Sequence, residues 1–124
     1  MPNILAIFLG GGIGAVSRYL VGLNLAKNFE INLPISTFLV NVTGSFIIGF
    51  LYVLFVEKAD VTPAVKLALT AGFCGGLTTF STFSLEVFEM LGNHQFFHAF
   101  TYTILSITVC VLTTAIGAYF AKLI

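Results

Sequence analysis

The chain has 124 residues, of which 58% are hydrophobic and 8% are charged, and its formal net charge is zero. A soluble domain carries about a quarter charged residues, so this composition excludes an ordinary soluble protein and indicates an integral membrane protein. The balanced charge offers no basic surface for nucleic acid, so we expect no nucleic-acid partner.

Four segments are long and apolar enough to cross a bilayer as helices, since a hydrocarbon core requires roughly 20 residues. They cover approximately residues 3–26, 35–56, 63–91 and 96–122. A strict alternation of apolar and polar residues is missing, which argues against a transmembrane β-barrel. We therefore predict an all-α, multi-pass membrane protein with four transmembrane helices in a single membrane domain, residues 1–124.

Lysine and arginine are distributed almost evenly between the two predicted sides of the membrane. The termini and the loop at 57–62 share one side, and the loops at 25–34 and 92–95 share the other. The first side carries three of these residues and the second carries two: Lys58, Lys66 and Lys122 against Lys27 and Arg18. Because an excess of Lys and Arg in cytoplasmic loops sets orientation, this balance predicts insertion in both orientations.

The first segment contains Gly10 and Gly14, four residues apart. This spacing favours close packing of another helix, and the strand and acidic residue that a dinucleotide site requires are missing. Arg18 follows one turn later on the same face. Two interpretations of Arg18 stay open: an anchor at the membrane interface, or a positive charge at the mouth of an aqueous cavity that attracts anions.

The second segment presents one face of small and polar residues at helical spacing: Thr37, Asn41, Gly44, Ser45 and Ile48. Asn41 is the one amide near the middle of a predicted span. Its side chain either bonds to a neighbouring helix or offers its NH₂ group to something that passes through the membrane.

The third segment contains GFCGGLTTFSTFSLE, residues 72–86, in which the adjacent pair Gly75 and Gly76 precedes five hydroxyl residues. We predict a helix break near Gly75–Thr79, because glycine lowers the cost of interrupting the helix and hydroxyls satisfy freed backbone groups. Carbonyls that end the first half suit a cation, and amides that start the second half suit an anion. Phe80 and Phe83 add ring edges of positive partial charge. Glu86 lies one turn beyond Phe83, and its environment is left open.

The fourth segment carries two overlapping polar rows. The first is Tyr102, Ser106, Cys110, Thr113 and Gly117, and the second is Ser106, Cys110 and Thr114. A single hydroxyl in a lipid-embedded helix means little, because it can bond to its own helix. A row that faces the hydroxyls of other helices is typical of a polar pathway. We interpret Cys74 and Cys110 as buried free thiols.

The segments NLPISTFLVNVTGSFIIGF and GFCGGLTTFSTFSLEVF, with the glycine-rich first helix, resemble the Fluc (CrcB-type) fluoride channels of microbes. The resemblance covers essentially the whole chain, and the motif GGLTTFSTF is highly specific. It implies an antiparallel, dual-topology homodimer with two pores in the bacterial plasma (inner) membrane. It also implies passive, fluoride-selective export of cytoplasmic fluoride down its electrochemical gradient, and hence fluoride resistance.

The resemblance further implies a structural Na⁺ at the centre of the dimer. Backbone carbonyls at the break of the third helix hold this ion in the family, and they match those of Gly75 and Thr78 in this chain. Oxygen ligands suit a hard alkali cation.

The pore residues of the family also have counterparts here. Phe80 and Phe83 match the pore phenylalanines, and Asn41 matches the pore amide. Cys110 stands where the polar track of the fourth helix leads us to expect a hydroxyl. The remaining residues of the expected pore are Ser81, Thr82, Ser106, Thr114 and Arg18.

Other functions fit the sequence less well. A small multidrug-type cation/proton antiporter is the alternative, but it needs a carboxylate in the first helix, and residues 3–26 contain none. A non-transporting assembly subunit predicts packing residues without an aligned polar track. An enzyme requires a nucleophile with a base, or a metal-ligand set, and we find neither.

Overall fold

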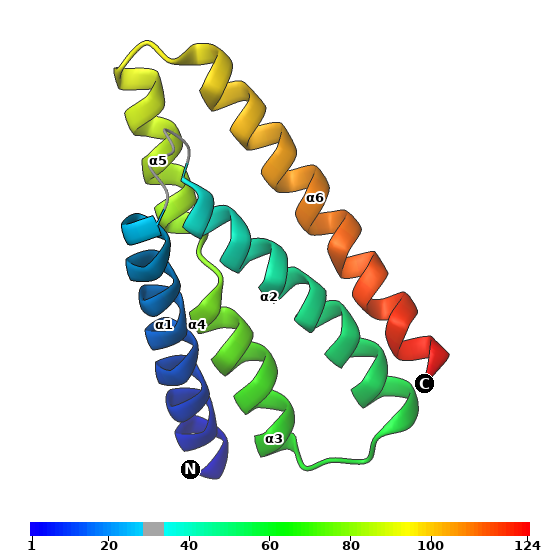
Figure 1. Cartoon of the computed structure of the whole chain (residues 1–124). Coiled ribbons are helices and arrows are strands. Elements are labelled where there is room, and N and C mark those ends of the chain that lie inside the picture. The colour runs from blue at the N-terminus through cyan, green and yellow to red at the C-terminus, as the bar shows by residue number, and fades with distance from the viewer. Residues whose placement is uncertain (29–33) are drawn as a thin grey trace.

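The computed structural model describes residues 1–28 and 34–124. Within these ranges every regular element is helical, so the all-α class is confirmed (Figure 1). Most of the predicted loop at 25–34 lies outside the described residues.

Three helices are long and apolar enough to cross a membrane, judged over the described residues. Helix α1 spans Pro2–Asn28. Helix α2 spans Ile35–Val53 and continues as a π-helical segment, η1, over Leu54–Lys58. Helix α6 spans Phe96–Leu123.

The remaining predicted span is divided into short helices. Helix α3 spans Pro63–Leu67, π-helix η2 spans Ala68–Cys74 and α4 spans Gly75–Leu77. After an extended stretch at Thr78 and Thr79, helix α5 spans Phe80–Gly92. The predicted break is therefore present, but it lies at the two threonines while Gly75 and Gly76 stay helical.

Glycines allow α1 to pack directly on the backbone of η2 and α4. A β-carbon added to Gly10 would overlap the carbonyl of Ala68, and one added to Gly14 would overlap that of Phe73. A β-carbon on Gly76 would in turn overlap the carbonyl of Gly11. The packing function predicted for the Gly10–Gly14 spacing is confirmed.

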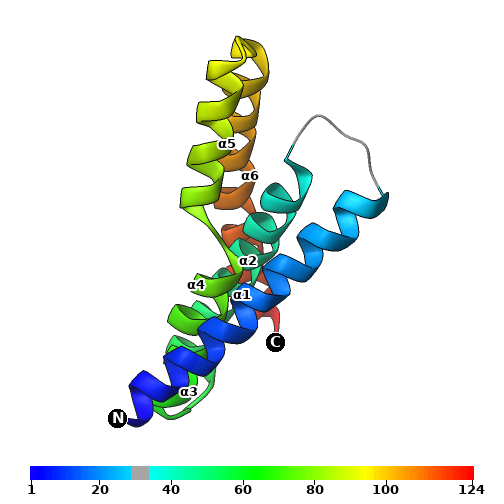
Figure 2. The ribbon, with the colours of Figure 1, turned by 90° about the vertical axis from the view of Figure 1, so that its left-hand side faces the viewer.

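Helix α2 packs mainly on α6, and α5 also packs on α6. Both termini lie toward the end of the molecule that holds the connection from η1 to α3, while the turn between α5 and α6 lies at the opposite end (Figures 1 and 2). Figure 2 also shows the extended stretch that separates α4 from α5.

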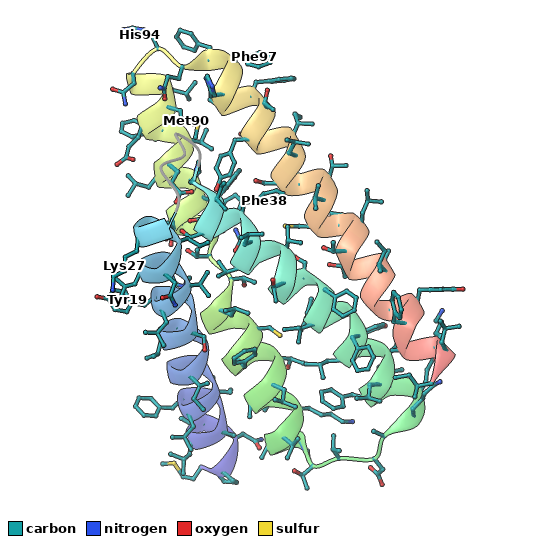
Figure 3. All side chains as sticks on the ribbon, viewed as in Figure 1. Tyr19, Lys27, Phe38, Met90, His94 and Phe97 are labelled. Carbon is teal, nitrogen blue, oxygen red and sulfur yellow. The ribbon has the colours of Figure 1, made fainter. Side chains whose placement is uncertain are left out.

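The interior of the isolated chain is small. Its main cluster consists of Phe83, Met90, Ala99 and Tyr102, against which Phe38 and Val87 pack. Tyr19 on α1 points away from the other helices and is 65% exposed (Figure 3). Large apolar side chains along every long helix are exposed in this way, which fits a chain surrounded by lipid or by a further subunit.

Candidate functional site

The helix break is held by the side chain of Asn41. Its Nδ2 donates to the carbonyl of Thr79 at 3.2 Å, and its Oδ1 accepts from the amide of Thr79 at 2.7 Å. In a continuous helix the Thr79 amide would bond to the Gly75 carbonyl, four residues earlier. We refer to these two hydrogen bonds between Asn41 and Thr79 as the clamp. Because of the clamp, the Gly75 carbonyl loses the amide donor that it would have in a continuous helix.

The hydroxyl of Thr79 caps the second half-helix. It accepts from the amide of Thr82 at 3.1 Å, as expected for a threonine at the N-cap position. The Thr82 amide would otherwise bond to the Thr78 carbonyl. Both carbonyls that the sequence assigns to a cation, those of Gly75 and Thr78, thus lose the amide that would pair with them in a helix.

Arg18 contacts the break from α1. Its Nε donates to the carbonyl of Gly76 at 3.1 Å, in place of the amide of Phe80 that a continuous helix would supply. Neither interpretation of Arg18 from the sequence anticipated this contact. The guanidinium group offsets the negative partial charge at the end of α4.

A groove of about 600 Å³ runs between α2, the broken third segment and α6. Six of the predicted pore and metal residues line it: Asn41, Gly75, Thr78, Phe80, Phe83 and Ser106. Gly44 and Ser45, from the small face predicted on the second segment, line it as well. Four predicted residues do not line this groove: Ser81, Thr82, Thr114 and Arg18.

Three aromatic rings follow one another from the groove inward. The ring centroids of Phe80 and Phe83 are 5.6 Å apart, and those of Phe83 and Tyr102 are 5.1 Å apart. Phe80 is 76% exposed, whereas Phe83 is 7% exposed. The pairs are tilted at 44° and 48°, so ring edges and ring faces are both presented to neighbouring groups.

The hydroxyls of α6 differ in their availability. Thr114 donates to the carbonyl of Cys110 at 2.9 Å, within its own helix. Ser106 is buried at 7% exposure and lines the groove, and its Oγ has no hydrogen-bond partner within the part of the chain that the structure describes. Such an unpaired buried group is costly unless something binds to it.

The sequence left the environment of Glu86 open, and the structure defines it. Thr37 donates to its Oε1 at 2.5 Å, and Tyr102 donates to its Oε2 at 2.7 Å. Thr37 and Tyr102 appear in the predicted polar faces of the second and fourth segments, but nothing in the sequence indicated that they meet at Glu86.

The groove is lined by groups that can bind an anion weakly. It combines an amide, hydroxyls and aromatic edges, and the acidic and basic side chains lie outside its lining. The described residues contain no group of three His, Cys, Asp or Glu side chains that could hold a metal ion. Cys74 and Cys110 both line the groove as free thiols.

The sequence matches known proteins over nearly its whole length. Residues 5–118 match the family model described as CrcB-like protein, Camphor Resistance (CrcB). The chain is 41% identical over 122 residues to the fluoride-specific ion channel FluC of Hydrogenobaculum sp., which covers 98% of this chain and 99% of the relative. It is 43% identical over 122 residues to the FluC of Gloeothece citriformis, with 98% of each chain covered.

Proposed function

The chain belongs to the CrcB family of fluoride channels, and on that premise we propose that it conducts fluoride passively out of the cytoplasm. The family consists of ion channels, so the protein is not an enzyme. Its long apolar helices make it a multi-pass protein of the bacterial inner membrane.

The ion path that we propose follows the groove. The observation that supports it best is the meeting of Asn41, Phe80, Phe83 and Ser106 on one surface from three separate segments. Fluoride is a small anion and a strong hydrogen-bond acceptor, so hydroxyl, amide and ring-edge donors can replace part of its water. Donors without formal charge hold the ion weakly enough to release it again. Ser81, Thr82, Thr114 and Arg18 stay predictions of the resemblance.

The fourth membrane crossing in this proposal is the pair of half-helices between Pro63 and Gly92. The first half, α3 to α4, has 15 residues and the second has 13. At a rise of 1.5 Å per residue they are about 22 and 20 Å long, so together they are long enough to cross the bilayer even when tilted. An extended backbone at membrane depth persists where protein buries it or where it lines a cavity.

A second copy of the chain completes the channel in this proposal, packed antiparallel to the first. Four thin segments are too few to enclose a pore, and Phe80 is 76% exposed although it belongs to the expected pore. The even distribution of Lys and Arg supports insertion in both orientations.

The structural Na⁺ is proposed to bind the carbonyls of Gly75 and Thr78. These two carbonyls suit a cation because the amides that would bond to them in a continuous helix have other partners. The Thr79 amide bonds to Asn41, and the Thr82 amide bonds to the Thr79 hydroxyl. Carbonyl oxygens that lack their helical donors are suitable ligands for a hard cation. When bound, the ion would supply positive charge that offsets the carbonyl dipoles at the break.

Fluoride efflux tests the proposal. Liposomes that contain this protein as their sole protein are loaded with fluoride, and a fluoride electrode records release while a potassium ionophore clamps the potential. We expect rapid fluoride release and very slow chloride release under the same conditions. Equal rates for the two anions would contradict the proposed selectivity.

A further inference from the structure

A cluster of three side chains lies one helical turn beyond the groove on three different helices. Thr37 precedes Asn41 by four residues on α2, and Tyr102 precedes Ser106 by four on α6. On α5, Glu86 follows Phe83 by three residues. We refer to Thr37, Glu86 and Tyr102 as the carboxylate cluster.

The carboxylate cluster is continuous with the groove through an aromatic contact. The ring of Tyr102 lies 5.1 Å from that of Phe83, which lines the groove. Tyr102 also lines a second cavity of about 150 Å³, together with Phe38 and Leu105. The cluster therefore lies between the groove and a further cavity, at one end of the series of rings.

Both hydroxyls of the cluster are committed to Glu86. Thr37 and Tyr102 are 5% and 6% exposed, and they donate to separate oxygens of the carboxylate, at 2.5 and 2.7 Å. Bonds to a charged acceptor are about twice as strong as bonds between neutral groups, so the carboxylate fixes the direction of both O–H donors. Fluoride that passed Phe83 would meet two donors that are already occupied, beside a negative charge.

We propose that Glu86 is a positioning residue that keeps fluoride from being trapped at this end of the pore. Through its bonds to Thr37 and Tyr102 it withholds their donors from a passing ion, and its charge repels that ion toward the exit. A pore must bind its ion strongly enough to admit it and weakly enough to release it. The carboxylate of Glu86 weakens binding at this end of the pore and so allows release. This inference rests on the proposed function.

The test is the dependence of fluoride flux on fluoride concentration in liposomes. Glu86→Gln keeps the size of the side chain but removes its charge, so the ion should bind more tightly and leave more slowly. We expect the apparent KM for fluoride to fall about tenfold. A unit charge beside the ion path in a partly buried site changes the affinity for the ion by at least roughly that factor. The maximum flux should fall as well. Glu86→Asp should restore both values in part.

Glu89→Gln is the matched control, because Glu89 is exposed one turn further along the same helix and should leave both values unchanged. Tyr102→Phe gives an independent test with the opposite sign. It leaves the charge of Glu86 with one fewer hydrogen-bond donor, so the carboxylate should repel fluoride more strongly and the apparent KM should rise. It also keeps the inference testable if Glu86→Gln does not assemble.

A lower maximum flux with an unchanged KM in Glu86→Gln would overturn the inference, as would an unchanged KM in Tyr102→Phe. If the changes in KM caused by Glu86→Gln and Tyr102→Phe were additive in the variant that carries both substitutions, the inference would also be overturned, since residues that act through each other are coupled. Failure of the proposed function is a different result, in which the unsubstituted protein conducts no fluoride at all.

Discussion

The clamp between Asn41 and Thr79 makes a quantitative prediction about the helix break. Asn41→Ala removes both hydrogen bonds, the 3.2 Å bond from Nδ2 to the Thr79 carbonyl and the 2.7 Å bond from the Thr79 amide to Oδ1. At about 1 kcal/mol of net stability for each bond, the break loses about 2 kcal/mol. Since 1.4 kcal/mol corresponds to a factor of ten, local opening at Thr79 should become about 30 times more frequent.

Amide hydrogen exchange of the assembled protein measures this opening directly. The Thr79 amide should exchange about 30-fold faster in Asn41→Ala than in the unsubstituted protein, in the regime where exchange follows the population of the open form. The Ala99 amide, which bonds to the Gln95 carbonyl at 2.9 Å in α6, serves as the internal control and should not change.

Asn41→Asp separates the two bonds of the clamp. An ionised aspartate still accepts from the Thr79 amide but cannot donate to the Thr79 carbonyl, so protection of that amide should be largely kept. Fluoride flux should nevertheless stop, because a negative charge then lines the proposed path. If Asn41→Ala changed the exchange rate at Thr79 by less than threefold, the clamp would not hold the break and our reasoning about it would be wrong.

Four further predictions follow from other parts of the structure. Gly76→Ala should lower the stability of the fold by about 1–3 kcal/mol, because its β-carbon would overlap the Gly11 carbonyl, whereas Gly12→Ala, with open space around it, should leave the unfolding temperature unchanged. Phe80→Ile and Phe83→Ile should both reduce fluoride flux by removing ring edges, and Phe83→Ile should also lower the unfolding temperature, since Phe83 is buried within the chain itself at 7% exposure. Replacing Na⁺ by choline should lower the unfolding temperature of the proposed dimer, and an unchanged temperature would remove the basis for the proposed Na⁺ site at Gly75 and Thr78. Single cysteines placed at the C-terminus should be labelled from both sides of intact cells, and adding several lysines to one loop should restrict labelling to one side and abolish fluoride flux.

The sequence predicted those features that depend on local pattern. Runs of apolar residues indicated long membrane helices, and the spacing of Gly10 and Gly14 indicated the close contact that α1 makes with η2 and α4. The break near Gly75–Thr79 was also predicted, because glycines followed by hydroxyls are typical of discontinuous helices.

The exact position of the break depends on a contact between segments that are far apart in the chain. Gly75 and Gly76 remain helical, and the extended residues are Thr78 and Thr79, because Asn41 supplies partners for the Thr79 backbone from α2. No local pattern around residue 79 indicates this partner. The same limit applies to Arg18, whose acceptor, the Gly76 carbonyl, lies 58 positions away in the sequence.

Glu86 shows a second limit of sequence reasoning. In the sequence, a carboxylate near the end of a predicted span looks the same whether water or protein surrounds it. Its two hydroxyl partners come from α2 and α6, 49 and 16 positions away, and helix packing alone brings them together.

Reversal-potential recording across a planar bilayer tests the central claim most directly. With fluoride on one side, chloride on the other and the same cations on both, a fluoride-selective pore sets the potential at which current vanishes far toward the fluoride equilibrium potential. For this protein we predict a reversal potential that is displaced far from zero in the direction set by the fluoride gradient. In Asn41→Asp we predict that the current is lost. A reversal potential near zero would show that chloride passes as readily as fluoride, and would contradict the account.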